Sequence, residues 1–209
     1  MQNRFITVEG VEGAGKSSAV STIIRWLDAT QTGRVVATRE PGGTALGEDL
    51  RGLLLGHREE GMSSNAELLL MFAARAEHLA RVIQPALAAG DWVVCDRFTD
   101  ASFAYQGGGR GLDSTRIQAL ADWTHPDLMP GLTLWLDVPV MVGLSRAAGR
   151  SAPDRFETEK AAFFDSVRET YAQRHATEPG RIKRIDAAPA IDQVQAQIEQ
   201  TLAEAFAHA

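Results

Sequence analysis

The fold is decided near the amino terminus by the stretch "FITVEGVEGAGKSS", residues 5–18. Its first part, Phe5–Val8, is a short apolar run that predicts a buried strand, and the helical pattern of Ser17–Leu27 follows. Between them lies "GVEGAGKS", residues 10–17, with the spacing of a phosphate-binding loop. Glycines in such a loop let backbone N–H groups point at phosphate oxygens in front of a helix. The stretch therefore predicts a nucleoside triphosphate site, although a carboxylate, Glu12, stands inside it.

The whole loop is expected to bind ATP. Lys16 would reach the β and γ phosphates and act in catalysis, and the Ser17 hydroxyl would ligate Mg²⁺, the predicted cofactor. The predicted ATP site comprises Gly10, Val11, Glu12, Gly13, Ala14, Gly15, Lys16, Ser17 and Ser18. Because such loops serve ATPase switches, motors and kinases alike, the second substrate must be inferred from other parts of the chain.

Apolar runs alternate with helical stretches along the rest of the chain, which is typical of a parallel sheet covered by helices. The predicted class is α/β, a five-stranded parallel sheet flanked by helices in a single domain, residues 1–209. The predicted strands are Phe5–Val8, Val35–Thr38, Trp92–Cys95, Leu132–Leu136 and Ile182–Ile185, and the predicted helices include Ser17–Leu27, Ala66–Leu87 and Ile191–Ala207. Two glycine-containing segments, 107–111 and 149–153, are expected to be mobile loops.

The amino-acid composition argues against two classes of binding partner, nucleic acids and membranes. The formal net charge is −6 and the pI is near 5.4, so no overall basic field attracts nucleic acid or an anionic membrane. No apolar run approaches the roughly 18 residues that span a bilayer. The single cysteine, Cys95, lies in an apolar run and cannot form an intramolecular disulfide. We expect a soluble cytoplasmic protein with no nucleic acid or membrane partner.

Polar residues follow the predicted strands, where ligands of open parallel sheets bind. Asp96 and Arg97 come after Trp92–Cys95, so the carboxylate could hold Mg²⁺ through water while the arginine meets a phosphate. Asp137 has the same local pattern after its own strand, and the pattern alone leaves both open as the metal ligand. We favour Asp96 because the neighbouring arginine supplies a second anion-binding group.

Two further motifs point to an acceptor site. In "TREPGGT", residues 38–44, Arg39 stands at a strand end and could clamp one phosphate together with Arg97. In the helical stretch "AELLLMFAARAEHL", Phe72 and Arg75 share a face through their i, i+3 spacing and could stack on a base and donate to its carbonyl. Core packing is the alternative reading for Phe72.

Together these motifs resemble bacterial thymidylate kinases. The resemblance rests on "VEGVEGAGKS", "TREPGGT", "LLLMFAARAEHL", "VVCDRF", "AYQGGGRG" and "LWLDVP", which occur in the family's order from the first strand to the last helix. It implies a P-loop NTPase fold with a mobile lid, transfer of the γ-phosphoryl group of ATP to dTMP, and a homodimer. The alternatives are a kinase of another nucleoside monophosphate or of a deoxynucleoside, and a non-kinase ATPase switch.

The resemblance also implies roles at the base and sugar. Phe72 would stack on thymine and Arg75 would hydrogen-bond a base carbonyl. Ser102 and Gln106 would flank the base edge. Tyr105 would lie against the sugar where a ribose 2′-hydroxyl would intrude, which favours deoxyribose.

At the phosphate end, the resemblance assigns the dTMP phosphate to Arg39 and Arg97, with Pro41 shaping the turn and able to take the cis form. It also places Glu12 beside the 3′-hydroxyl of the acceptor sugar, so that this carboxylate faces dTMP. A carboxylate aimed at a triphosphate would instead be repelled in a dry site. Arg97 and Glu12 are therefore candidate catalytic residues.

Some members of the family carry an arginine directly after the acidic loop residue, whereas here Gly13 and Ala14 follow. Another segment must then supply a guanidinium to the transferring phosphoryl group. The candidate is a lid at about 145–157, which contains Arg146, Arg150 and Arg155, and among these Arg150 is the first choice as the catalytic residue.

Overall fold

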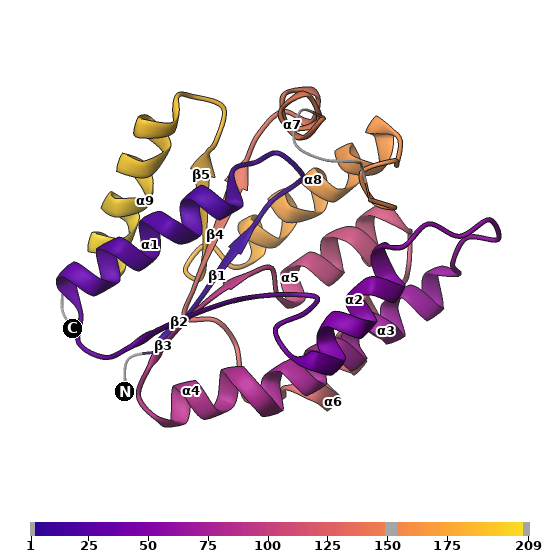
Figure 1. The fold of residues 1–209 in the computed structure, drawn as a ribbon. Coiled ribbons are helices and arrows are strands. Elements are labelled where there is room, and N and C mark those ends of the chain that lie inside the picture. The colour runs from indigo at the N-terminus through magenta and orange to yellow at the C-terminus, as the bar shows by residue number, and fades with distance from the viewer. Residues whose placement is uncertain (1–2, 149–153, 207–209) are drawn as a thin grey trace.

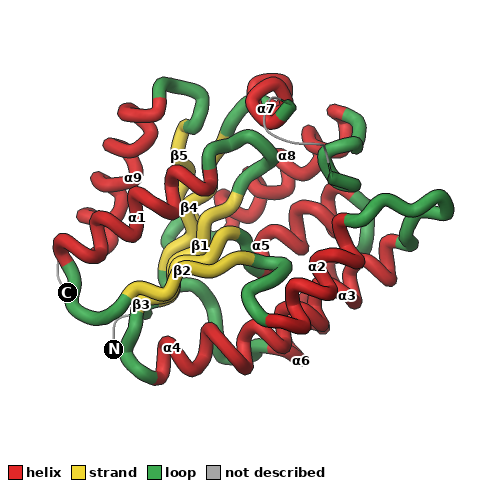
Figure 2. Tube along the Cα trace, viewed as in Figure 1, coloured by secondary structure: helices red, strands yellow, loops and turns green. Residues whose placement is uncertain are grey.

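One sheet contains the five strands that the structure describes, and all of them pair in parallel in the order β2-β3-β1-β4-β5 (Figures 1 and 2). The computed structural model describes residues 3–148 and 154–206. The strands are β1 (Phe5–Glu9), β2 (Val35–Arg39), β3 (Trp92–Asp96), β4 (Leu132–Asp137) and β5 (Ile182–Asp186). Each begins where predicted and runs one residue further, onto a charged residue. The predicted fold class is confirmed.

Position in the sheet explains the apolar character of the strands. Every residue of β1 and β4 is buried because helices cover both faces of these inner strands. The edge strands β2 and β5 are only partly buried and accordingly carry more polar side chains, such as Lys183 and Arg184.

Helices cover both faces of the sheet. On one face α1 packs against α9, and the other helices lie across the sheet from them (Figure 1). The helices are α1 (Lys16–Thr30), α2 (Ala45–Leu55), α3 (Ser64–His78), η1 (Leu79–Ile83), α4 (Gln84–Ala88), α5 (Thr99–Ser102), η2 (Phe103–Gly109), α6 (Ser114–Thr124), α7 (Val140–Ala147), α8 (Ala161–Thr177) and α9 (Ile191–Phe206). None of the helices in residues 3–148 and 154–206 is both long and apolar enough to cross a membrane.

The structure changes one loop prediction and leaves the other untested. The segment 107–111 was expected to be a mobile loop, but the π-helix η2 continues to Gly109. A Cβ on Gly108 would lie 2.1 Å from Oγ1 of Thr170, and a Cβ on Gly109 would lie 2.4 Å from Cε2 of Phe163. These two glycines therefore allow η2 to approach α8 closely, which the sequence pattern did not reveal. The segment 149–153 lies outside the described residues.

The charged strand ends meet at one edge of the sheet. In the parallel register Asp96 is paired with Val8 on one side and with Arg39 on the other, and Glu9 is paired with Trp135. Three neighbouring strands thus bring their final charged residues together beside the loop that opens α1. This edge carries the candidate active site.

Candidate active site

The phosphate-binding loop follows β1 and opens α1, as its context predicted. Gly10, Gly13 and Gly15 have φ values of 144°, 70° and 94°, which L-residues with side chains rarely adopt. At Gly13 a Cβ would lie 1.9 Å from the carbonyl oxygen of Gly143 in α7, so the loop could not pass there with a side chain. No side chain caps the start of α1. Its first N–H groups are therefore available to an anion.

Lys16 folds back across this loop. Its Nζ donates to the carbonyl oxygens of Gly10 and Val11, each at 3.2 Å. Burial and the nearby Arg97 charge lower the pKa of Lys16, while Glu12 raises it in part. Lys16 and Ser17 line a polar cleft with Asp96 and Arg97. The structure thus brings together the loop, the predicted catalytic lysine and the predicted metal ligands.

The two aspartates that the sequence left open as metal ligands have different surroundings. Oδ1 of Asp96 is buried and has no hydrogen-bond partner among the described residues, and the side chain lines the same cleft as Ser17. Asp137 instead forms ion pairs of 2.6 Å with both Arg168 and Arg184. An unpaired buried carboxylate oxygen is costly unless a cation meets it, so the surroundings favour Asp96 as the residue that faces a metal.

Glu12, Arg97 and Tyr105 form a hydrogen-bonded cluster between the loop and η2. Nη2 of Arg97 donates to both carboxylate oxygens of Glu12 at 2.9 and 2.8 Å, and the Tyr105 hydroxyl donates to Oε2 at 2.5 Å. Burial alone would raise the pKa of Glu12, but Arg97 and Lys16 outweigh it and lower the pKa. Glu12 is therefore an ionised residue whose carboxylate is held by Arg97 and Tyr105.

Arg97 has backbone geometry that points to function. Its φ is 71°, and it is the one residue other than glycine with a positive φ among those that the structure describes. The backbone on either side is held by β1, because Arg97 N donates to the Val8 carbonyl at 2.9 Å and Phe98 N donates to Oε1 of Glu9 at 2.7 Å. Burial, followed by the charge of Asp100, raises the pKa of Glu9 to about 8. Sequence reasoning did not assign this role to Glu9.

A second cleft opens on the acceptor side. Six of the predicted substrate residues line it with polar side chains, namely Glu12, Arg75, Arg97, Ser102, Tyr105 and Gln106. Its apolar wall is formed by Pro41, Leu55, Met71, Phe98, Ala101 and Phe156. This mixture of an apolar wall and a few convergent polar groups suits a planar base on a polar sugar.

Arginines gather where the two clefts meet. Arg97 and Arg51 line both clefts, and Arg39 lines the loop cleft, where it makes two 2.8 Å hydrogen bonds to Glu48. Sequence reasoning missed Arg51, although its position in α2, the helix that begins directly after "TREPGGT", was an available signal. Arg51 donates to the carbonyl oxygen of Pro41 at 2.9 Å, and the Glu40–Pro41 peptide bond is cis, as the turn was expected to allow.

Comparisons with known proteins agree with this arrangement. The family model described as Thymidylate kinase matches residues 8–198. The chain belongs to the thymidylate kinase family. It is 57% identical over 205 residues to a thymidylate kinase of Alkalilimnicola ehrlichii, covering 98% of this chain and 94% of that protein. With a thymidylate kinase of Pseudomonas syringae pv. tomato it shares 56% identity, covering 98% of this chain and 97% of the other.

A solved structure extends the likeness to three dimensions. The crystal structure of thymidylate kinase from Ehrlichia chaffeensis superposes with a TM-score of 0.78 at 31% sequence identity. The match covers 97% of this chain and 99% of that one. The predicted family and fold are confirmed, and the phosphate loop, the acceptor cleft and the arginine cluster lie on a thymidylate kinase scaffold.

Two predicted substrate residues do not line the acceptor cleft of this thymidylate kinase family member: Arg39 lines only the loop cleft, and Phe72 lines neither cleft. Phe72 is 3% exposed and packs in the core with Leu68 and Phe103, beneath the guanidinium of Arg75. Met71 lines the cleft in its place. The reason is helical geometry, because positions i and i+4 also share a face, and in α3 the face of Met71 and Arg75 is the one that points into the cleft. Phe72 is therefore a core residue in this structure, which was the alternative interpretation of its position in the sequence.

The predicted lid lies partly outside the described residues. Arg150 is among the residues that the structure does not describe. Arg146 donates to the carbonyl oxygens of Ala187 and Ala188 at 2.8 and 2.9 Å, in the segment between β5 and α9. Arg155 pairs with the buried Glu67 at 2.7 Å. Two of the three candidate lid arginines therefore have partners away from the loop cleft.

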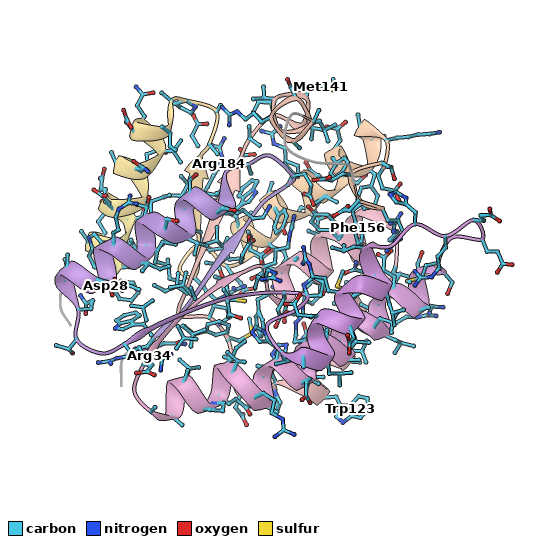
Figure 3. The ribbon with its side chains drawn as sticks, viewed as in Figure 1. Asp28, Arg34, Trp123, Met141, Phe156 and Arg184 are labelled. Atoms are coloured by element: carbon cyan, nitrogen blue, oxygen red, sulfur yellow. The ribbon has the colours of Figure 1, made fainter. Side chains whose placement is uncertain are left out.

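The segment after the undescribed residues closes over the clefts. Arg155 donates from its backbone and from Nε to the end of α2, and Phe156 is buried against the acceptor side (Figure 3). Asp154 lines both clefts, and Glu157 lines the loop cleft. Asp154 and Glu157 were not predicted as site residues, because a charged residue in a loop is usually exposed and no sequence motif distinguishes these two.

A third groove borders the phosphate loop on its outer side. It is lined by Gly13, Gly15 and Ser18 of the loop region and by Arg146 and the segment Ala187–Ile191. Because Arg146 lies along the backbone of that segment, its side chain forms one wall of the groove. The groove has the place and composition to receive the nucleoside end of a triphosphate held by the loop.

Proposed function

We propose that this protein transfers the γ-phosphoryl group of ATP to the 5′-phosphate of dTMP, giving ADP and dTDP for dTTP synthesis. The observation that carries the proposal is the shared wall of the two clefts. The two clefts share five lining residues, Glu12, Glu40, Arg51, Arg97 and Asp154. A donor phosphate held by the loop and an acceptor phosphate held by the arginines would therefore face each other without a barrier, as in-line transfer requires.

The acceptor needs no strong general base, because a phosphate monoester is already ionised near neutral pH. Catalysis then depends on placing two anions against each other and neutralising the charge that moves between them. Lys16 would contact the β and γ phosphates, while Arg39, Arg51 and Arg97 would hold the dTMP phosphate. Arg150 remains our candidate for the guanidinium on the transferring group.

The residues present fit a divalent cation at the loop. Asp96 offers a buried oxygen that has no hydrogen-bond partner in residues 3–148 and 154–206, and Ser17 lines the same cleft. Mg²⁺ takes few protein ligands at nucleotide sites and completes its shell with phosphate oxygens and water. We propose that Ser17 and Asp96 hold Mg²⁺ there, and that the ion neutralises charge on the β and γ phosphates.

Nucleoside recognition is proposed to use the other end of the acceptor cleft. The Glu12 carboxylate would accept a hydrogen bond from the 3′-hydroxyl, and Tyr105, held against Glu12, would occupy the space of a ribose 2′-hydroxyl. Arg75, Ser102 and Gln106 would meet the edge of thymine. Met71, in place of Phe72, would contact its face through a polarizable thioether.

We also propose a homodimer in the cytoplasm. Large apolar side chains are exposed on the adjoining helices α2, α3 and α6, and Trp123 is 82% exposed and points outward from α6 (Figure 3). Leu46 and Leu53 of α2 and Leu69 of α3 are exposed as well. An apolar surface of this kind fits a second copy of the chain. Sedimentation equilibrium should show a dimer, and Leu69→Arg should shift it toward the monomer.

The test of the function is a coupled ADP-release assay with ATP and Mg²⁺. The acceptors dTMP, dUMP, dCMP, dAMP and thymidine are added one at a time, and chromatography identifies the product. We expect equal amounts of ADP and dTDP with dTMP and weak activity with dUMP. ADP release that ignores every acceptor would overturn the proposal and indicate an ATPase, and a preference for another acceptor would reassign the substrate.

A further inference from the structure

Glu40 is a buried carboxylate that the proposed reaction has not yet used. It follows Arg39 at the end of β2, is 5% exposed, and lines both clefts. We propose that Glu40 is a positioning residue that fixes the guanidinium of Arg75 for recognition of the base and sets which end of the substrate binds there. The inference rests on the proposed function, because it concerns the thymine end of the acceptor cleft.

Glu40 and its neighbours leave Arg75 a single orientation. Nε of Arg75 donates to Oε2 of Glu40 at 2.7 Å, Nη1 donates to Oγ of Ser102 at 3.0 Å, and Nη2 donates to the carbonyl oxygen of Phe98 at 3.1 Å. The guanidinium also lies over the rings of Phe72 and Phe98, at 4.6 and 5.2 Å from their centroids. Three of its five N–H groups are thus used within the described residues, which leaves one on each terminal nitrogen for a ligand.

Glu40 itself is held from the opposite side. Its Oε1 lies 3.0 Å from Nδ1 of His78, and Nε2 of His78 lies 2.6 Å from Oγ1 of Thr38. A neutral imidazole with its proton on Nδ1 satisfies both contacts, since Nδ1 then donates to Glu40 and Nε2 accepts from Thr38. His78 is fully buried. The chain from Thr38 to Arg75 therefore ties β2 to α3 through side chains that water does not reach.

The charge of Glu40 decides what the Arg75 end of the cleft attracts. Burial alone would raise the pKa of Glu40, but Arg75 and His78 outweigh it and lower the pKa, so the pair carries no net charge. At the other end the loop cleft is lined by Lys16, Arg51 and Arg97, and Nη1 of Arg97 has no hydrogen-bond partner among the described residues. These donors suit a phosphate, whereas Arg75, neutralised by Glu40, acts at its own end as a directed hydrogen-bond donor to a neutral base.

The experiment compares thymidine and dTMP binding in the full-length protein by calorimetry. Thymidine lacks the phosphate, so it reports the base end alone. For Glu40→Gln we expect thymidine affinity to fall about tenfold, the effect of losing one charge-assisted hydrogen bond. We expect the preference for dTMP over dCMP to fall as well, with kcat at saturating dTMP within about threefold of the parent. Glu77→Gln is the matched control, because Glu77 lies on α3 with Arg75 but pairs with Arg81 at the surface.

The mechanism predicts dependence on Arg75. In an Arg75→Met background, Glu40→Gln should cause no further loss of thymidine affinity, because the residue it positions is absent. Thr38→Val leaves the Glu40 and Arg75 side chains intact and loosens only the His78 anchor, so it should lower thymidine affinity in the same direction by a smaller factor. This variant keeps the test available if Glu40→Gln does not fold.

Three results would overturn the inference. Thymidine binding unchanged while dTMP binding falls would place Glu40 at the phosphate end. A further loss in the Arg75→Met background would mean that Glu40 does not act through Arg75. A drop in kcat with unchanged affinities would assign Glu40 to transfer. Failure of the parent protein to bind either ligand would instead overturn the proposed function.

Discussion

Arg97→Ala is the substitution that tests the shared wall most directly. The side chain donates to Glu12 and lies 4.6 Å from the centroid of the Tyr105 ring, and its Nη1 is buried without a partner among the described residues. This nitrogen is the group we expect to meet the acceptor phosphate. Loss of one preorganised donor of this kind lowers kcat by about 10²- to 10³-fold. The coupled ADP-release assay at saturating ATP and dTMP measures that drop.

The same substitution also affects stability, and the two effects must be separated. Arg97 and Glu12 are 16% and 14% exposed, between surface pairs and fully buried ones, so leaving Glu12 alone should lower the free energy of unfolding by about 2 kcal/mol. ATP affinity should change little, because the loop backbone and Lys16 hold the triphosphate. Glu12→Gln with Arg97→Ala removes the unpaired charge, and we expect it to restore stability while kcat stays low.

Two outcomes would refute this reasoning. If kcat of Arg97→Ala lies within about twofold of the parent, the guanidinium does not act on the transferring charge. If the double variant recovers full turnover, the defect of the single variant came only from the unpaired Glu12 carboxylate.

Three further predictions follow from the same geometry. Met71→Ala should raise the KM for dTMP about tenfold with little change in melting temperature, whereas Phe72→Ala should destabilise the fold by about 3–5 kcal/mol. Arg150→Ala should lower kcat by about 10³-fold or more, whereas Arg155→Ala should mainly lower stability, by about 2 kcal/mol, since it leaves Glu67 short of a partner. Burial raises the pKa of Glu9 from 4.5 to about 8, so its stabilising contribution is complete below pH 4.5 and is lost as the pH rises through 8. The parent should therefore lose stability relative to Glu9→Gln across that range, by up to about 1.4 kcal/mol for each pH unit.

Each of these has a result that contradicts it. An unchanged KM in Met71→Ala, with a raised KM in a folded Phe72→Ala variant, would return the base contact to Phe72. Normal turnover in Arg150→Ala would exclude its catalytic role. Parallel pH curves of unfolding free energy for Glu9→Gln and the parent would show that the Glu9 pKa is not raised in the folded state.

Local patterns in the sequence determined much of this protein. The order of residues in "FITVEGVEGAGKSS" specifies strand, loop and helix, because strand burial, glycine dihedrals and a helix start are properties of neighbours along the chain. All five strands begin where the apolar runs predicted, and the inner strands show this most clearly because helices cover both of their faces. The resemblance of several motifs to one family was confirmed across nearly the whole chain.

Only the tertiary structure decided which equivalent-looking residues face the site. Asp96 and Asp137 both end apolar strands, yet only Asp137 forms ion pairs with two arginines, one from β5 and one from α8, among the described residues. Which aspartate meets these arginines depends on how the helix and strand pack. Met71 and Phe72 differ by one step along a helix, and the choice between cleft and core depends on how α3 is rotated against its neighbours. In the sequence Glu40 is one charged residue in a turn, and nothing marks it as important. In the folded protein the packing of β2 and α3 places it against Arg75. Patterns along the chain predict which residues are polar or buried, but partners far apart in sequence are set by packing.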